Sequence, residues 1–173
     1  AALMPLSIFS SHYNKILRVG FIGTGLRGQW MLWLATKYPD VEIPAICDID
    51  DGMISAALKI IKDSGREEPK VYKKNDEDFR NMVKDEDLDG VYIATPWEWH
   101  HPMAIAAMKA GIHVGTEVPA ALTVNECWDL VNVSEKTEKF CMIMENVCYR
   151  RDIMAILNMV RQNMFGEILH CQG

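Results

Sequence analysis

The sequence has 173 residues, of which 49% are hydrophobic and 24% are charged, with a formal net charge of −6. This length and composition are typical of a globular domain with a substantial core. An acidic chain without a run of Lys and Arg is not expected to bind nucleic acid. Its apolar stretches are too short to span a bilayer, so a membrane partner is not expected either.

The first predicted element is a strand at 17–22, which leads directly into Gly23-Thr24-Gly25-Leu26-Arg27-Gly28. This is a G-x-G-x-x-G motif between a strand and a helix. Gly23 would permit a tight turn, Gly25 would let a pyrophosphate approach the backbone, and Gly28 would let the helix lie close to the strand. The N–H groups and the positive dipole end of that helix would face the phosphates. The segment therefore predicts a dinucleotide site.

The second predicted strand, at 42–48, ends at Asp48. A carboxylate at this point can accept hydrogen bonds from the ribose hydroxyls of adenosine, and it repels a 2′-phosphate, which favours NAD over NADP. In the alternative interpretation, Asp50 caps the next helix and Asp48 is a solvated loop acid. Asp51 is also close by. The glycine motif favours Asp48 as the residue that holds the ribose.

Strand-like and helix-like segments continue to alternate along the chain. We expect helices at about 26–37, 51–63, 76–84, 102–111, from Thr123 onward and at 150–164, and strands at 70–73, 90–94, 112–115, 140–144 and 167–173. Pro102 suits the first turn of its helix. Thr123 and Glu126 form a capping-box pattern, and the helix that they begin is expected to bury Val124, Cys127, Trp128 and Val131. The alternation predicts an α/β fold, a Rossmann-like doubly wound parallel sheet covered by helices on both faces.

Three regions are expected along the chain. Residues 1–16 form an apolar N-terminal extension, residues 17–148 the dinucleotide-binding domain, and residues 149–173 a connecting helix with the first strand of a second α/β domain. A terminal strand would leave an unpaired edge. We therefore expect the sequence to be the amino-terminal part of a longer protein, truncated where the second domain begins.

Ligands of parallel α/β sheets bind at the carboxyl ends of the strands, and this rule selects further candidate residues. They are Thr95, Trp97, Glu98, Trp99 and His100 after the strand at 90–94, Glu117 and Val118 after the strand at 112–115, Asn146 after the strand at 140–144, and Tyr149 at the start of the last helix.

Each candidate also has a structural interpretation. Trp97 and Trp99 could pack against a planar nicotinamide, or they could simply cover the end of the sheet. Glu117 could be a solvated charge and Tyr149 a surface residue. Asn146 could offer its amide to a carboxamide or simply form a turn. His101 is expected to face solvent or to cap the helix, because adjacent histidines point apart and make a poor metal pair.

Five cysteines are present, and none of them forms a C-x-x-C pair. A disulfide framework or a zinc site is therefore not expected, and no metal ligands are predicted. Cys47, Cys141 and Cys171 lie in apolar strand-like runs and are expected to be buried thiols. Reduced thiols favour a cytoplasmic location.

Together, the Gly23–Gly28 loop, Asp48, Thr95-Pro96 with His100, Glu117-x-Pro119 and Asn146 resemble the glucose–fructose oxidoreductase/inositol dehydrogenase (Gfo/Idh/MocA) superfamily. The resemblance covers about residues 17–173. It implies an NAD-binding half, followed by an α/β domain whose large open sheet supplies much of the substrate site. Most dehydrogenases of this superfamily carry Glu-Lys-Pro, whose lysine assists proton transfer. Val118 stands in place of that lysine, and a valine cannot transfer a proton.

Longer strings are similar to a narrower group. Thr95–His100, Glu117–Ala121 and Glu145–Asp152 resemble the NAD-dependent glycosidases of glycoside hydrolase family 109, typified by α-N-acetylgalactosaminidase. The resemblance implies that NAD is tightly held and regenerated in each turnover, while the sugar is oxidised at C3, loses its aglycone, adds water at C1 and is reduced again. It further implies that the cofactor is lined by Leu26, Arg27, Asp48, Trp97, Glu98, Trp99, His100, Glu117, Val118 and Asn146.

The same resemblance places the catalytic residues mostly beyond Gly173, with Tyr149 as a candidate contributor. The 173 residues alone are then expected to bind NAD and to turn over nothing. The expected partner is a small-molecule glycoside or sugar, and a homo-oligomer would form through the sheet of the second domain. Members with tightly held NAD can also be exported, so a periplasmic location stays open. Two alternatives remain, a sugar or polyol dehydrogenase without the lysine and a non-catalytic NAD-binding module.

Overall fold

A computed structural model describes residues 16–172, so the predicted extension lies outside the described residues except for Ile16. The chain divides into two units, a body that ends at Ile143 and a C-terminal unit that begins at Met144. The limits predicted from sequence for the two domains, at 148 and 149, stay a prediction. None of the helices within residues 16–172 is both long and apolar enough to cross a membrane.

The body is built on a parallel sheet, as predicted. Six strands lie in the order β4-β3-β1-β5-β6-β7, and the two-residue β2 pairs with the start of β1. Every strand pairing in the described body is parallel. The strands are β1 Leu17–Ile22, β2 Val41–Glu42, β3 Ala45–Cys47, β4 Lys70–Tyr72, β5 Gly90–Ile93, β6 His113–Thr116 and β7 Cys141–Ile143.

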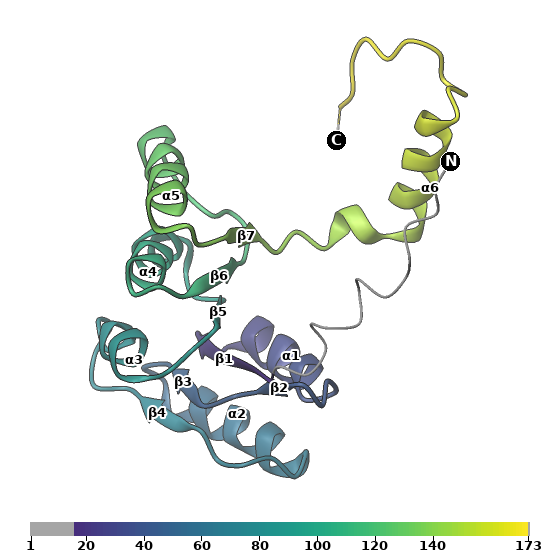
Figure 1. The fold of residues 1–173 in the computed structure, drawn as a ribbon. Helices are drawn as coiled ribbons and strands as arrows, with labels where there is room; N and C mark the ends of the chain where they lie inside the picture. Colours follow the sequence, from purple (N-terminus) through teal and green to yellow (C-terminus); the bar gives the residue numbers. More distant parts are fainter. Residues whose placement is uncertain (1–15, 173) are drawn as a thin grey trace, which may run out of the picture. The chain divides into compact units, whose positions relative to one another are not determined.

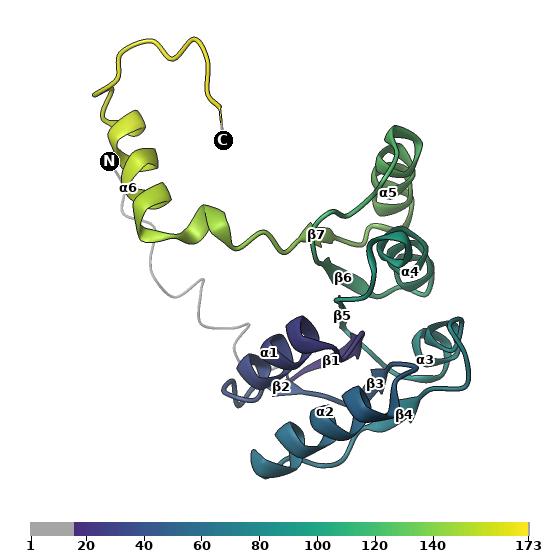
Figure 2. The ribbon, with the colours of Figure 1, turned by 180° about the vertical axis from the view of Figure 1, so that it is seen from behind.

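Helices cover both faces of the sheet. Within the body, α1 and α2 lie on one face and α3, α4 and α5 on the other (Figures 1 and 2). Their bounds are α1 Leu26–Ala35, α2 Asp51–Asp63, α3 Phe79–Asp85, α4 Trp97–Lys109 and α5 Val124–Thr137. This is the doubly wound arrangement expected from the alternating elements, and it brings the loops after β1, β3, β5 and β6 to one edge.

The core lies between the sheet and its helices. Ile22, Ile93 and Thr116 are neighbours across β1, β5 and β6, and each is at most 1% exposed. Phe79 of α3 and Met108 of α4 are completely buried within the same core. Removing this much apolar surface from water is the main stabilising contribution, and it fixes the strand ends that carry the candidate residues.

The strand predicted at 42–48 is interrupted. β2 ends at Glu42 and β3 begins at Ala45, so Ile43 and Pro44 leave the ladder. Proline has no N–H to donate to a neighbouring strand. The carbonyl of Pro44 still accepts a hydrogen bond from the N–H of Lys70, which aligns β3 with β4 beyond the break.

The prediction that Pro102 lies in the first turn of its helix is wrong. α4 begins at Trp97, and Pro102 lies inside it. Pro96 is the residue just before the helix. Its φ of −55° is the value that the proline ring favours, and its ψ of 149° is extended rather than helical. The helix loses one backbone hydrogen bond at Pro102, but the burial of His100 and Met103 on either side of it compensates.

α5 is capped as predicted but buries a different face. Thr123 accepts a hydrogen bond from the Glu126 N–H, and the Glu126 side chain accepts one in return from the Thr123 N–H. Leu130 is the one buried residue of the described helix, whereas Val124 and Trp128 are 72% and 62% exposed. α5 is the last helix in its layer, so it packs against α4 and the sheet on one side only.

The C-terminal unit contains a 3-10 turn, η2 Val147–Tyr149, and the helix α6 Arg151–Arg161. The strand predicted at 167–173 is wrong for residues 167–172, which have no strand conformation, and Gly173 lies outside the described residues. A strand needs a partner for its backbone N–H and C=O groups. The apolar stripe of α6, which includes Ile156 and Leu157, is exposed within the described structure.

The glycine loop brings backbone against backbone where β1 meets α1. Gly23 has φ +86°, and a Cβ there would lie 2.6 Å from the Ala94 carbonyl oxygen. A Cβ on Gly28 would lie 2.0 Å from the Gly23 carbonyl oxygen, whereas a Cβ on Gly25 would have nothing within 4 Å. The outer glycines are therefore needed for packing, and Gly25 opens onto free space.

Substituting Gly28 with Ala should lower the free energy of unfolding by at least about 2 kcal/mol, because α1 must move away from β1. Gly25→Ala is the matched control, and it should cost less than about 1 kcal/mol because its methyl group meets no atom. Urea unfolding followed by circular dichroism measures both. Equal stability of the two variants would contradict the close-packing argument.

Candidate functional site

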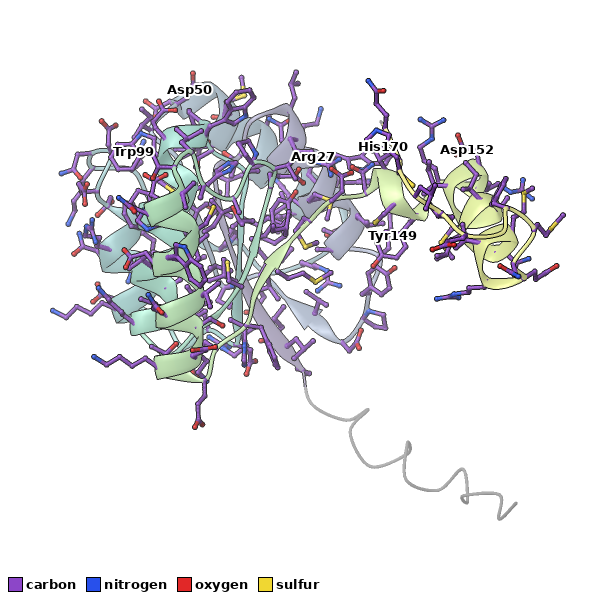
Figure 3. All side chains as sticks on the ribbon, turned by 90° about the horizontal axis from the view of Figure 1, so that it is seen from above. Arg27, Asp50, Trp99, Tyr149, Asp152 and His170 are labelled. Atoms are coloured by element: carbon purple, nitrogen blue, oxygen red, sulfur yellow. The ribbon has the colours of Figure 1, made fainter. Side chains whose placement is uncertain are left out.

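A cavity of about 240 Å³ opens where β1, β3 and β5 end. It is lined by five of the residues predicted from sequence, which are Gly23, Gly25, Asp48, Thr95 and Trp99. Figure 3 shows Arg27, Asp50 and Trp99 along the same edge of the body, opposite the edge where β1 begins. Five of the predicted residues therefore lie together at the carboxyl ends of the strands, where the rule for parallel sheets places a ligand.

Asp48 is bound to the glycine loop. Its Oδ2 accepts hydrogen bonds from the backbone N–H of Thr24 at 2.6 Å and from the Thr24 hydroxyl at 3.0 Å. Its Oδ1 accepts one from the Asp50 N–H at 3.0 Å. Asp48 is thus not a solvated loop acid, although Asp50 does cap α2 as the alternative interpretation required. An ionised carboxylate has about four acceptor positions, so Asp48 retains capacity for a ligand hydroxyl.

Further residues of the cavity wall were missed by the sequence analysis, among them Ile49, Met53, Asn75 and Asp76. Asn75 and Asp76 follow β4, the outermost strand on this side of the sheet. The rule that selected Thr95 and Glu117 also applies to the end of β4, so this signal was available. Ile49 and Met53 give the wall beside Asp48 an apolar character, which suits a flat ring better than a phosphate.

Arg27 and Glu117 are joined across the site. Arg27 Nε lies 2.7 Å from Glu117 Oε1, and the Tyr92 hydroxyl donates to the same oxygen. The Glu117 side chain is 12% exposed and that of Arg27 is 38% exposed. A sequence separation of 90 residues is thereby closed between the first turn of α1 and the end of β6. Tyr92, which lies within β5, gave no sequence signal.

The pKa values in this cluster shift with its hydrogen bonds. The hydrogen bond to Glu117 raises the pKa of the Arg27 guanidinium, with a smaller opposing effect of burial. Burial, followed by the hydrogen bond to Glu117, raises the pKa of Tyr92 well above its usual range. Both residues therefore keep their protons at neutral pH, so Arg27 is a cation and Tyr92 a hydrogen-bond donor.

The residues of the first turn of α4 have different surroundings. Trp99 lies on the cavity wall and packs edge-on against Phe79, with ring centroids 6.1 Å apart. Trp97 is 61% exposed, and Glu98 is exposed as well. His100 is 1% exposed, and its ring contacts backbone carbonyls rather than the cavity. Of the predicted tryptophan wall, the structure therefore brings Trp99 alone onto the cavity.

Two further positions, Val118 and His101, lie in the loop after β6 and inside α4. Val118 is 41% exposed, next to the partly buried Glu117. His101 was expected to face solvent or to cap α4, and this is wrong. Its side chain is 19% exposed, and its Nε2 lies 3.3 Å from Asp129 of α5. Because α4 begins at Trp97, before the two histidines, His101 lies inside a packed helix.

Asn146 and Tyr149 belong to the C-terminal unit. Asn146 precedes η2, and its carbonyl accepts a hydrogen bond from the Tyr149 N–H at 3.1 Å. Tyr149 is 69% exposed within that unit. Asn146 therefore forms a turn locally, and its contact with a cofactor, like any part of Tyr149 in catalysis, stays a prediction.

Metal chemistry has no support within residues 16–172, where no group of three or more His, Cys, Asp and Glu side chains could hold an ion. Cys47 is buried on the cavity wall, and burial raises the pKa of its thiol to about 12, so it stays protonated. Cys141 is partly buried, and Cys171, expected to be buried, is exposed. All five thiols are free.

The arrangement fits a dinucleotide. Of the described residues, none caps the N-terminus of α1 with its side chain, and Gly25 leaves open space in front of that helix end. Such a helix end attracts a diphosphate through its N–H groups and its dipole. Asp48 lies beside it with acceptor capacity for a diol, and Ile49 and Met53 supply an apolar wall.

Fold and site together define an NAD-binding Rossmann domain, and the chain belongs to the Gfo/Idh/MocA oxidoreductase family. Residues 17–145 match the model described as "Oxidoreductase family, NAD-binding Rossmann fold". Residues 149–173 match "Glycosyl hydrolase 109, C-terminal domain", so within that family the chain is related to the family 109 glycosidases. Both resemblances drawn from the sequence motifs are thereby confirmed.

Curated relatives agree with this placement. The chain is 57% identical over 155 residues to a "Glycosyl hydrolase family 109 protein" of Parabacteroides distasonis, covering 89% of this chain and 33% of that protein. It is 54% identical over 158 residues to an "Alpha-N-acetylgalactosaminidase" of Tannerella forsythia, covering 91% of this chain and 34% of that protein. The chain thus spans about a third of the length of these relatives.

Solved structures share the fold. The myo-inositol 2-dehydrogenase of Lactobacillus plantarum is similar with a TM-score of 0.75 and 26% identity, covering 89% of this chain and 43% of that one. The scyllo-inositol dehydrogenase of Lactobacillus casei, solved with NAD(H) and scyllo-inositol, has a TM-score of 0.77 and 21% identity over 89% of this chain and 43% of that one. At that identity the second likeness shows the fold alone.

Replacing Tyr92 with Phe should change how stability depends on pH. In the unfolded chain Tyr92 loses its proton at about pH 10, whereas in the folded chain its raised pKa keeps the proton on. The folded state therefore binds more protons above this pH, and stability falls as pH rises. The variant lacks this component, so its stability deficit at neutral pH should shrink above about pH 10.

Urea unfolding at a series of pH values measures this difference. Tyr38→Phe is the control, because it removes the same hydroxyl group from a tyrosine that is 53% exposed. A deficit of Tyr92→Phe that is the same at neutral and alkaline pH would contradict the assignment.

Proposed function

We propose that this chain is the NAD-binding part of a redox-assisted glycosidase that acts on N-acetylgalactosaminides. The observation that carries the proposal is the open space at Gly25 in front of the N-terminus of α1, with Asp48 fixed beside it. A simple dehydrogenase and a redox-assisted glycosidase would share this cofactor site, so the site alone does not distinguish them. The similarity to family 109 proteins supports the glycosidase assignment.

In its bound state NAD supplies a hydride acceptor and donor, so that the sugar C3 hydroxyl can be oxidised, the aglycone eliminated, water added at C1 and the hydride returned. Net chemistry is hydrolysis, and no redox equivalent is consumed. The oxidation at C3 makes the C2 proton acidic. This route does not require the two flanking carboxylates of ordinary glycosidases.

The residues of this chain bind and orient the cofactor. The N–H groups at the start of α1 receive the diphosphate, which approaches closely because Gly25 has no side chain. Asp48, already bound to Thr24, receives the ribose diol on its remaining acceptor positions. Its negative charge repels a 2′-phosphate, which favours NAD over NADP.

Arg27 and Glu117 act at the other side of the loop. Glu117 is held by Arg27 and Tyr92, so its charge is fixed in place before a ligand arrives. Arg27 retains further N–H donors, because its Nε alone is used by Glu117, and they are available to a phosphate. Val118 can supply packing at this point but cannot move a proton.

Asp48→Asn should weaken NAD binding by about tenfold and reduce the preference for NAD over NADP, because a charged acceptor is lost. Asp51→Asn is the matched control, because this exposed carboxylate pairs with Lys73 and does not line the cavity. Isothermal titration calorimetry measures both affinities, and thermal unfolding separates binding from folding. Unchanged NAD affinity in folded Asp48→Asn would remove the ribose role.

The full-length protein should cleave an aryl α-N-acetylgalactosaminide without added NAD and without net formation of NADH. In heavy water the released sugar should carry deuterium at C2, because elimination removes that proton and solvent replaces it. The Asp48→Asn variant should need added NAD for the same cleavage, and Asp51→Asn should not.

The outcomes separate the alternatives. Steady formation of NADH from a free sugar or polyol would instead indicate a dehydrogenase. NAD binding with neither reaction would indicate a non-catalytic module. Cleavage that leaves hydrogen at C2 would refute the redox-assisted route.

A further inference from the structure

His100 connects two loops of the candidate site. Its Nδ1 lies 2.7 Å from the carbonyl oxygen of Pro119, and its Nε2 lies 2.8 Å from that of Thr95. Thr95 lies between β5 and α4, and Pro119 follows β6. The ring is 1% exposed, so water does not compete for either contact.

Both partners of the ring are acceptors. A carbonyl oxygen cannot donate, so a hydrogen bond forms only where a ring nitrogen carries a proton. Which ring nitrogen donates depends on the tautomer, and the ring spans the two carbonyl oxygens in either case.

The segment tied down in this way includes Glu117 and Val118. The Glu117 N–H donates to the Ile93 carbonyl at 3.0 Å, and the Glu117 side chain is held by Arg27. Two residues further on, Pro119 is held by His100. Val118 thus lies between two fixed points, and on the other side of the ring Thr95 is fixed on the cavity wall.

We propose that His100 is a positioning residue, whose ring bridges the carbonyls of Thr95 and Pro119 and so sets the loop after β5 and the loop after β6 at the spacing that NAD needs. This inference rests on the proposed function. His100 does not touch the cofactor in this role and acts through the backbone of Thr95 and the Glu117–Pro119 segment.

The hydrogen-bond part is tested without cofactor, by nuclear magnetic resonance of the full-length protein with ¹⁵N-labelled histidine. The His100 resonances are assigned by their loss in His100→Gln. A His100 ring N–H that is protected from exchange with solvent is expected, because the buried ring donates to a backbone carbonyl. A ring N–H that exchanges as fast as that of an exposed histidine would overturn the proposal.

The positioning part is tested by NAD affinity. His100→Phe, which can donate no hydrogen bond, should weaken NAD binding by about tenfold, whereas His100→Gln, which keeps an amide donor group, should weaken it less. His101→Gln is the matched control on the next residue of α4 and should stay within about twofold of the unsubstituted protein. Folded His100→Phe or His100→Gln with unchanged NAD affinity would overturn the positioning role.

The two experiments also distinguish a failure of this inference from a failure of the proposed function. If the unsubstituted protein binds no NAD, the proposed function and the positioning role both fail, while the resonance experiment still decides whether a His100 ring N–H is hydrogen-bonded within the protein. If NAD binds normally and the His100 variants match His101→Gln, only the positioning role fails. If His100→Phe does not fold, His100→Gln and the resonance experiment carry the test.

Discussion

The contact between the backbones of Gly23 and Gly28 is the constraint on which the site depends. It sets how closely α1 approaches β1, since a Cβ on Gly28 would lie 2.0 Å from the Gly23 carbonyl oxygen. With the helix in this place, the Thr24 N–H reaches Asp48 and the Arg27 side chain reaches Glu117. A displacement of α1 would move Arg27, which lies in its first turn, away from Glu117.

The loops at this edge are fastened by bonds between side chains and backbone as well as by the sheet. Asp48 ties the end of β3 to the glycine loop, Glu117 ties the end of β6 to α1, and His100 ties the loops after β5 and β6 together. Under the proposed function, this matters for affinity. Groups that are already ordered lose little conformational entropy when a ligand arrives, and charges that are already oriented need no rearrangement to act.

Features that depend on short stretches of sequence were predictable. The glycine motif between strand and helix, the parallel sheet and the Thr123 capping box each follow from the pattern of neighbouring residues, and the structure contains all three. The misses came from tertiary packing. No local pattern reports that His100 reaches Pro119 or that Tyr92 reaches Glu117, since 19 and 25 residues separate these partners. The start of α4 was placed too late because Pro102 was read as a first-turn residue, whereas burial of its neighbours keeps it inside the helix.

Val118 decides how the chemistry is divided under the proposed function. Its neighbour Glu117 is held as an acceptor by Arg27 and Tyr92, and neither of those two groups gives up its proton at neutral pH. The cluster around position 118 is therefore a fixed electrostatic environment rather than a proton relay. A sugar oxidised at this edge must pass its hydroxyl and C2 protons to groups outside the cluster. In the family 109 relatives, two thirds of the protein lies outside the region matched here, so a substrate half with its own acid and base is compatible with a cofactor half that supplies neither.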